Sequence, residues 1–138
     1  MTERFLLYPS PPPAEVVRCL DIAGYEWIAV DDRSSISDQT PPDGWTGAIV
    51  AVDDDPAAGW KLCRELRRQD VPVEPLLLLL SGGQLTELDD QAQLFDDFLI
   101  APFHPQEFDA RIKHLLWRAG RGVRPELVAY GPLQLNIE

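Results

Sequence analysis

The stretch Asp96–Arg118, DDFLIAPFHPQEFDARIKHLLWR, carries the strongest fold signal in the chain. Residues 98–100 are an apolar run that predicts a short buried strand. His104 and Pro105 then predict the start of a helix, because a proline at the first helical position removes no hydrogen bond that the helix would have made. Apolar side chains follow at helical spacing, at Phe108, Ile112, Leu115 and Leu116. The stretch therefore predicts a strand, a sharp turn and a helix with one buried face, with both His104 and His114 outside the core.

This unit resembles the last strand and helix of bacterial response-regulator receiver domains, especially those of the OmpR/PhoB-type winged-helix family. In that family an acidic pair precedes a strand that ends in Lys-Pro-Phe, and the helix carries Ala-Arg-Ile. The matching residues here are Asp96, Asp97, Pro102, Phe103, Ala110, Arg111 and Ile112. Ala101 stands where the family has its lysine.

The rest of the chain repeats the alternation of strand and helix. Apolar runs predict four more strands, at residues 5–8, 25–30, 46–52 and 73–80. Helical patterns occupy residues 14–23 and 57–69. A further helix, the fourth of the expected fold when a short one at residues 31–45 is counted, is predicted through Leu85, Leu88, Ala92 and Phe95. Residues 31–45 are polar and hold at most a short helix. This order predicts an α/β protein of the flavodoxin-like, doubly wound (βα)5 type, with a five-stranded parallel sheet of strand order 2-1-3-4-5.

Three local features refine this prediction. Gly24 is expected to end the first helix in the left-handed conformation. Arg64, Arg67 and Arg68 are expected to remain in solvent. Cys19 and Cys63 lie within apolar helical patterns, which favours buried free thiols over a disulfide or a metal pair.

Length and charge limit the classes of function. A chain of 138 residues holds one well-buried core. A formal net charge of −11 disfavours direct binding of a nucleic-acid backbone by this portion. No apolar run approaches the roughly 20 residues that a membrane helix needs, and the first residues lack a secretory signal, so we expect a cytoplasmic protein.

The pattern changes after Ala119. Residues 120–125 read as a linker, and residues 127–136 alternate like the strands of a hairpin. They resemble the opening strands of the winged-helix effector domain that follows receivers in this family. We therefore predict a receiver-like domain at residues 1–119, and a linker with the first strands of a truncated winged-helix domain at residues 120–138. The alternative is a private extension that packs on the receiver.

The resemblance implies a phosphorylation pocket whose parts can be checked one by one. Receivers transfer a phosphoryl group to an aspartate at the end of strand three, using an acidic pair that binds Mg²⁺, a hydroxyl and a lysine, because metal and cation offset the phosphoryl charge. Here Pro9 and Ser10 replace the acidic pair, Ala51 falls at the acceptor position, Ser81 fits the hydroxyl position and Ala101 removes the lysine. Asp53 lies two residues beyond the acceptor position, and a small register shift would bring it closer. We interpret this set as a degenerate phosphorylation pocket: Pro9, Ser10, Ala51, Asp53, Ser81 and Ala101.

Other site chemistries find little support. Asp53, Asp54 and Asp55 read as a solvated acidic loop or as a negative cap on the following helix, because the helix dipole favours carboxylates there. Consecutive carboxylates lack the spacing of a calcium loop. The sequence carries no paired-cysteine metal motif, phosphate-binding glycine signature or nucleophile motif. We predict no enzyme activity, no metal and no cofactor.

The resemblance also implies an interaction surface. Receivers of this family pair through helix four, strand five and helix five, and acidic residues on one element with basic residues on the next suit a two-fold interface. We predict a homodimer interface at Leu88, Asp89, Asp96, Asp97, Arg111, Leu115 and Arg118. The alternative is that these are the solvated faces of ordinary helices.

The sequence therefore predicts a receiver-like regulatory and dimerisation domain of a DNA-binding transcriptional regulator, acting without aspartyl phosphorylation. In this it is similar to GlnR-like orphan regulators, whose fourth strand also runs into a Ser-x-Gly-Gly stretch. DNA would be bound only by a C-terminal domain beyond this portion. Two alternatives stay open: a stand-alone pseudo-receiver that binds a partner protein or small molecule, and a receiver still phosphorylated at Asp53.

Overall fold

The computed structural model describes residues 4–31 and 36–120, and in them five strands form one parallel sheet of order β2-β1-β3-β4-β5. This confirms the predicted strand order and the flavodoxin-like α/β fold. The strands are β1 (Arg4–Tyr8), β2 (Glu26–Ala29), β3 (Gly47–Ala51), β4 (Leu76–Leu80) and β5 (Asp97–Ile100).

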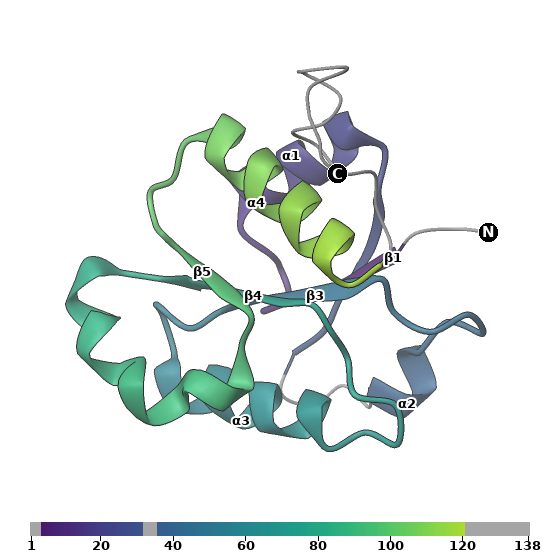
Figure 1. Ribbon diagram of the computed structural model, residues 1–138, viewed down its shortest axis with the longest axis horizontal. Coiled ribbons are helices and arrows are strands. Elements are labelled where there is room, and N and C mark those ends of the chain that lie inside the picture. The colour runs from purple at the N-terminus through teal and green to yellow at the C-terminus, as the bar shows by residue number, and fades with distance from the viewer. Residues whose placement is uncertain (1–3, 32–35, 121–138) are drawn as a thin grey trace, which may run out of the picture.

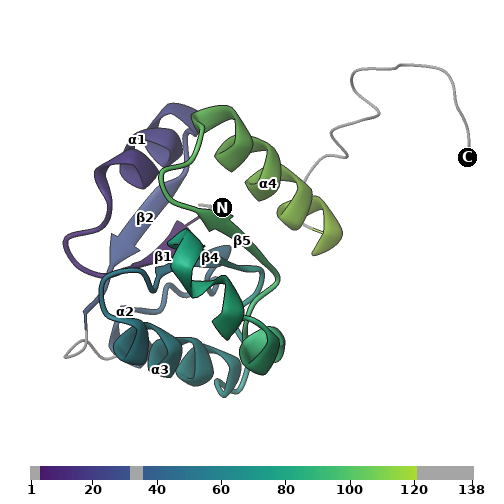
Figure 2. The same ribbon diagram turned by 90° about the vertical axis from the view of Figure 1, so that its left-hand side faces the viewer.

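Helices cover both faces of the sheet (Figures 1 and 2). On one face lie α1 (Ala14–Ala23) and α4 (Pro105–Arg118), and on the other lie α3 (Pro56–Arg67) and the short α2 (Ile36–Gln39). No helix in residues 4–31 and 36–120 is long and apolar enough to span a membrane. The predicted linker and winged-helix strands fall on residues 120–138, of which only Gly120 is among the described residues.

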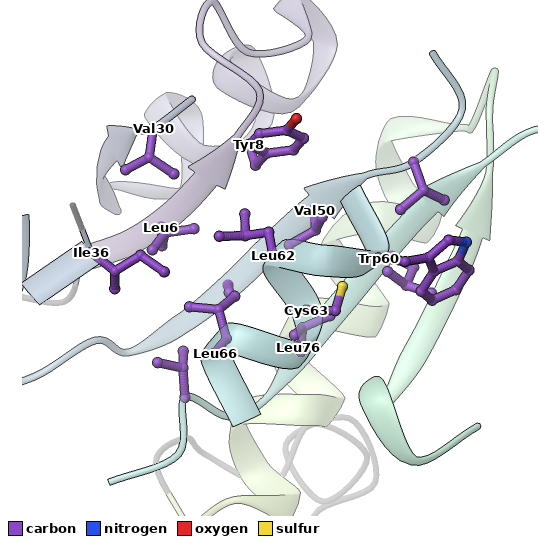
Figure 3. Close-up of a cluster of buried hydrophobic side chains, with 14 of the residues drawn as sticks. Leu6, Tyr8, Val30, Ile36, Val50, Trp60, Leu62, Cys63, Leu66 and Leu76 are labelled. Carbon is purple, nitrogen blue, oxygen red and sulfur yellow. The ribbon is translucent and has the colours of Figure 1, made fainter. Parts of the chain in front are cut away.

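The core has two layers because neighbouring residues of a strand point to opposite faces. In β1, Leu6 faces the α3 side and Leu7 faces the α1 and α4 side. Figure 3 shows the first layer, where Leu62 and Leu66 of α3 lie over the sheet near Leu6. All five leucines of β4 are at most 2% exposed. Burying a leucine contributes about 1.5–3 kcal/mol, which outweighs its small intrinsic preference for helix.

Two helix ends adopt the predicted geometry. Gly24 follows α1 with a φ of +86°, a left-handed conformation that glycine adopts without steric cost. His104 precedes α4, and its Nδ1 accepts a hydrogen bond from the backbone N–H of Gln106 at 3.1 Å. Pro105 then occupies the first helical position, as predicted.

The predicted fourth helix is wrong. The segment forms two short 3₁₀ helices, η1 (Gly82–Glu87) and η2 (Asp89–Leu94), with non-helical dihedral angles at Gln91 (φ −118°, ψ 16°). The predicted apolar face needed Leu85 in the core, but Leu85 is 41% exposed and the neighbouring Gln84 is buried instead. A helix with its expected apolar face therefore does not form, and we call residues 82–94 the η segment.

The expectation that Arg67 stays in solvent is also wrong. Its side chain is 18% exposed, and its Nη2 lies 3.1 Å from the Asp96 carboxylate. Its Nε donates to the carbonyl oxygen of Leu94 at 3.3 Å, and its Nη1 lies 3.6 Å from Glu74. The arginine therefore joins α3 to the segments that lead into β4 and β5.

Both cysteines are free thiols, as predicted. Cys63 lies in the core beneath α3, and burial raises the pKa of its thiol to about 12. Cys19 on α1 is only half-buried, and burial raises the pKa of its thiol as well. Neither thiol is a reactive thiolate near neutral pH.

Candidate functional site

A cleft of about 290 Å³ opens at the carboxyl ends of β1 and β3. Open parallel sheets place binding sites at this edge, where the strand order reverses beside β1. Tyr8 is the last residue of β1 and Ala51 is the last residue of β3. The lining residues are Tyr8, Pro9, Ser10, Asp31, Ala51, Asp54 and Asp55.

The structure brings together half of the predicted pocket residues. Pro9, Ser10 and Ala51 line the cleft, and Ala51 ends β3 without a carboxylate. Asp53 is an exposed loop residue two positions beyond the strand, outside the lining of the cleft. Ser81 and Ala101 follow β4 and β5 and are outside the lining too.

The charged groups around the cleft are all acidic. They are Asp31, Asp54 and Asp55, and neither lysine nor arginine is among the lining residues. Like charges at short range repel one another, so this cleft disfavours a phosphoryl group, whose charge is also negative. The cleft therefore lacks the cation that phosphate chemistry requires.

The residues present do not fit the Mg²⁺ ion of receivers either. Pro9 and Ser10 offer no carboxylate, and the side chain of Ala51 offers no ligand atom. Asp55 caps α3, since its Oδ1 accepts a hydrogen bond from the Ala58 N–H at 3.3 Å. No group of three or more histidine, cysteine or acidic side chains in the described part of the chain could hold a metal ion.

Ser81 is held by a residue that the sequence analysis missed. The Oε1 of Gln84 accepts hydrogen bonds from the backbone N–H of Ser81 at 2.9 Å and from its hydroxyl at 3.3 Å. The Nε2 of Gln84 donates to the carbonyl oxygen of Val52 at 2.7 Å. The spacing Ser-x-x-Gln is the signature of a capping box and could have identified this contact.

The second predicted site surrounds β5, and its acidic pair is bonded within the chain. Asp96 accepts a hydrogen bond from the Leu76 N–H at 2.7 Å, besides its contact with Arg67. Asp97 binds Nη1 of Arg111 through both carboxylate oxygens, at 2.9 and 3.2 Å. Each carboxylate therefore ties β5 to another element.

Arg111 also contacts Glu107, one helical turn earlier, at 3.1 Å. Burial lowers the pKa of the Arg111 guanidinium, but hydrogen bonds to Asp97 and Glu107 and their negative charges outweigh this and raise the pKa above its usual value. The arginine is therefore a cation at neutral pH.

The other predicted interface residues differ in exposure. Asp89 and Arg118 are exposed, and Leu88 is half-buried against the core layer under α3. Leu115 is 3% exposed and packs in the other layer, so it adds little to an open surface. It forms one wall of a recess of about 130 Å³ with Glu74, Pro75, Asp96, Arg118 and Ala119.

The chain is similar in sequence to two transcriptional regulators. The chain is 29% identical to the phosphate regulon transcriptional regulatory protein PhoB of Pseudomonas aeruginosa, over 92% of this chain and 56% of PhoB. It is 30% identical to the DNA-binding dual master transcriptional regulator RpaA of Synechocystis, over 80% of this chain and 58% of RpaA. The chain thus spans a little over half the length of these two relatives. No protein-family model matches it.

Solved structures show the same fold. A CheY-like response regulator receiver domain protein from Methanospirillum hungatei superposes with a TM-score of 0.71, covering 87% of this chain and 98% of that one. The sequence identity is 14%, so this likeness concerns the fold alone.

Proposed function

We propose that the chain is a receiver (CheY-like) domain of the response-regulator kind, with homologues among OmpR/PhoB-type transcriptional regulators, and that it regulates and dimerises such a regulator without aspartyl phosphorylation. One observation carries the proposal. Ala51, which the family resemblance aligns with the acceptor position, ends β3 in a cleft whose charged lining residues are all acidic. A phosphoryl group there would lack an acceptor, a metal site and a neutralising cation.

The test is incubation with a small phosphodonor and Mg²⁺, followed by intact-mass measurement. We expect an unchanged mass, whereas a stable acyl phosphate would reject the proposal. The Asp53→Asn variant is the matched control for the alternative that Asp53 is still phosphorylated. An adduct on the wild-type chain that disappears in this variant would establish that alternative.

Dimerisation is the second part of the proposal. The proposed face consists of the η segment, β5 and α4, with Asp89 and Arg118 exposed on it and Asp97 paired to Arg111 beside them. Acidic and basic groups on neighbouring elements suit a two-fold contact, in which each group meets its opposite on the other copy. We expect a reversible dimer in sedimentation experiments, weakened at high salt because partly exposed ion pairs are screened.

DNA binding belongs to the proposed whole protein. PhoB and RpaA are transcriptional regulators, and this chain covers 56% and 58% of their lengths. The DNA contacts would come from a domain that follows residue 120, since an acidic receiver repels the DNA backbone. Extending the chain to the full reading frame and measuring salt-dependent DNA binding tests this part.

A second candidate is a stand-alone pseudo-receiver that binds a small molecule or a partner protein, and the cleft at β1 and β3 favours it. Its volume of about 290 Å³ approaches the lower end of small-molecule sites, roughly 300 Å³. A strictly monomeric chain at high concentration would support this candidate. A dimer that persists at micromolar concentration would favour the first.

A further inference from the structure

The most informative residue outside the cleft is Gln84. Among the residues whose burial the structure describes, it is the one buried polar or charged side chain apart from aromatic residues and cysteine, with 8% of its surface exposed. A buried amide without partners costs free energy, but both ends of this amide are hydrogen-bonded. Its position is therefore fixed by polar contacts that a hydrophobic side chain could not make.

Those contacts join the loops that follow two neighbouring strands. Val52 is the first residue after β3 and Ser81 is the first residue after β4. The two strands pair in parallel, with Ala51 opposite Leu79. The side chain of Gln84 spans the gap between the two loops with a donor on one side and an acceptor on the other.

The β3 side of this link is itself rigid. The Val52 N–H donates to the Leu79 carbonyl at 2.8 Å. Helix α3 approaches so closely that a Cβ added to Gly59 would lie 2.6 Å from the Val52 side chain. Val52 is thus held by β4 on one side and by α3 on the other. Its carbonyl oxygen is therefore a fixed acceptor for the Gln84 side chain.

The η segment begins at this link. Gln84 lies in η1, and Glu87 at the end of η1 accepts a hydrogen bond from the Trp60 Nε1 at 3.2 Å. Short 3₁₀ helices have poor hydrogen-bond geometry and depend on such outside contacts. The direction in which η1 presents Leu85 to solvent is therefore set by two side chains, Gln84 and Glu87.

We propose that Gln84 is a built-in clamp between the β3 and β4 loops, which holds the η segment in one arrangement without a phosphoryl group. The amide is neutral, so the clamp needs neither metal nor cation. The Ser81 hydroxyl also donates to the Gln84 Oε1, and we infer that this hydroxyl has no role in the cleft. The effect on dimerisation rests on the proposed function, because the η segment is part of the proposed interface.

Hydrogen exchange of the Ser81 backbone amide measures the clamp directly. In the wild-type protein this amide should be protected at least tenfold over its intrinsic rate, and an unprotected Ser81 amide would overturn the proposal without any substitution. In Gln84→Met, which keeps the length of the side chain but removes both bonds, the protection of Ser81 and of the η segment should fall at least tenfold. Amides of β1 serve as the reference for global unfolding.

The variant Gln84→Glu separates a clamp from simple packing. Its carboxylate can still accept from the Ser81 N–H, but at pH 7.5 it cannot donate to the Val52 carbonyl, so Ser81 should keep its protection while the protection of the η segment falls as in Gln84→Met. Burial raises the pKa of a carboxyl group, and the protonated acid can donate again. Protection of the η segment in Gln84→Glu should therefore return as the pH falls towards 5.5, while the η segment of Gln84→Met stays unprotected. Equal behaviour of the two variants at all pH values would overturn the clamp.

Gln93→Glu and Gln93→Met are matched controls, since Gln93 is an exposed residue of η2. Both should leave the exchange of Ser81 unchanged. Sedimentation of Gln84→Met should show a dimer at least tenfold weaker than wild type. A loosened η segment with unchanged association would overturn the link to the interface, whereas a phosphoryl adduct or a monomeric wild-type chain would reject the proposed function and leave the exchange result standing.

Discussion

The two acidic clusters of this chain, Asp53–Asp55 and Asp96–Asp97, have opposite surroundings. The first follows β3, and Asp55 in it caps α3 by accepting a hydrogen bond from the Ala58 N–H. The second flanks the start of β5, and each of its carboxylates binds an arginine. The first cluster is an exposed loop, whereas the second joins β5 to neighbouring elements.

This difference teaches where acidic residues contribute to stability. A carboxylate in solvent gains little from the fold. A strand N–H and a half-buried arginine lose water on folding, and a carboxylate that bonds both of them replaces that water as their hydrogen-bond partner. Asp96 and Arg67 form the clearest case, joining α3, β4 and β5. The predictions below test this ranking of the two clusters.

The largest effect is expected at Asp96. Asp96→Ala removes the acceptor of the Leu76 N–H and leaves Arg67, which is 18% exposed, without its 3.1 Å partner. We expect the free energy of unfolding in urea to fall by about 2 kcal/mol. Asp96→Asn keeps an acceptor for Leu76 and should lose about half as much. Asp90→Ala, at an exposed position of η2, is the control, and equal losses at Asp90 and Asp96 would contradict the ranking.

Asp97 and Arg111 should show a smaller effect, because their side chains are 24% and 38% exposed. A double-mutant cycle with Asp97→Ala and Arg111→Ala should give a coupling energy of about 1 kcal/mol. The cycle is measured by chemical unfolding at a concentration where the chain is monomeric. A coupling that vanishes in the monomer and appears only in the dimer would show that the pair acts between copies.

The fold was largely predictable because it depends on patterns that are local in sequence. The five leucines of β4, Gly24 and Pro105 each determine their own segment, so strands, helix ends and strand order followed. The contacts of Arg67 with Leu94 and of Gln84 with Val52 were not predicted, since these partners lie 27 and 32 residues away in the sequence and meet only in the folded chain. The prediction of a helix at the η segment was wrong for the same reason. Gln84 bonds Val52 and is buried, and Leu85 is displaced from the expected apolar face.

The candidate site divides in the same way. Ala51 and Ala101 could be read as losses from position alone, and Ala51 does lie in the cleft. The sequence could not predict that Asp31 and Asp54 line the cleft. The loops after β2 and β3 are remote in sequence and converge only at the edge of the sheet. The role of Leu115 could not be predicted either. Its helical spacing fits a core position or an interface position, and only the packing of the folded chain places it in the core.

Within the first cluster, Asp55 should matter most. Asp55→Ala removes the acceptor of the Ala58 N–H at the start of α3. We expect a loss of about 0.5–1 kcal/mol in unfolding free energy, since a capping residue typically contributes that amount or somewhat more. Asp55→Ser retains an acceptor and should recover most of the loss. An equal loss in both variants would show that the negative charge, and not the cap, is what α3 requires.

The smallest effect is expected at Asp53 and Asp54, which are exposed and form no ion pair within the described part of the chain. Asp53→Asn and Asp54→Asn should each change the unfolding free energy by less than about 0.5 kcal/mol, the usual range for surface positions. A slight gain is the expected direction, because each removes one negative charge from a chain with a net charge of −11. A loss above about 1 kcal/mol at Asp53 alone would mean that its carboxylate has a buried partner, and the contrast between the two acidic clusters would fail.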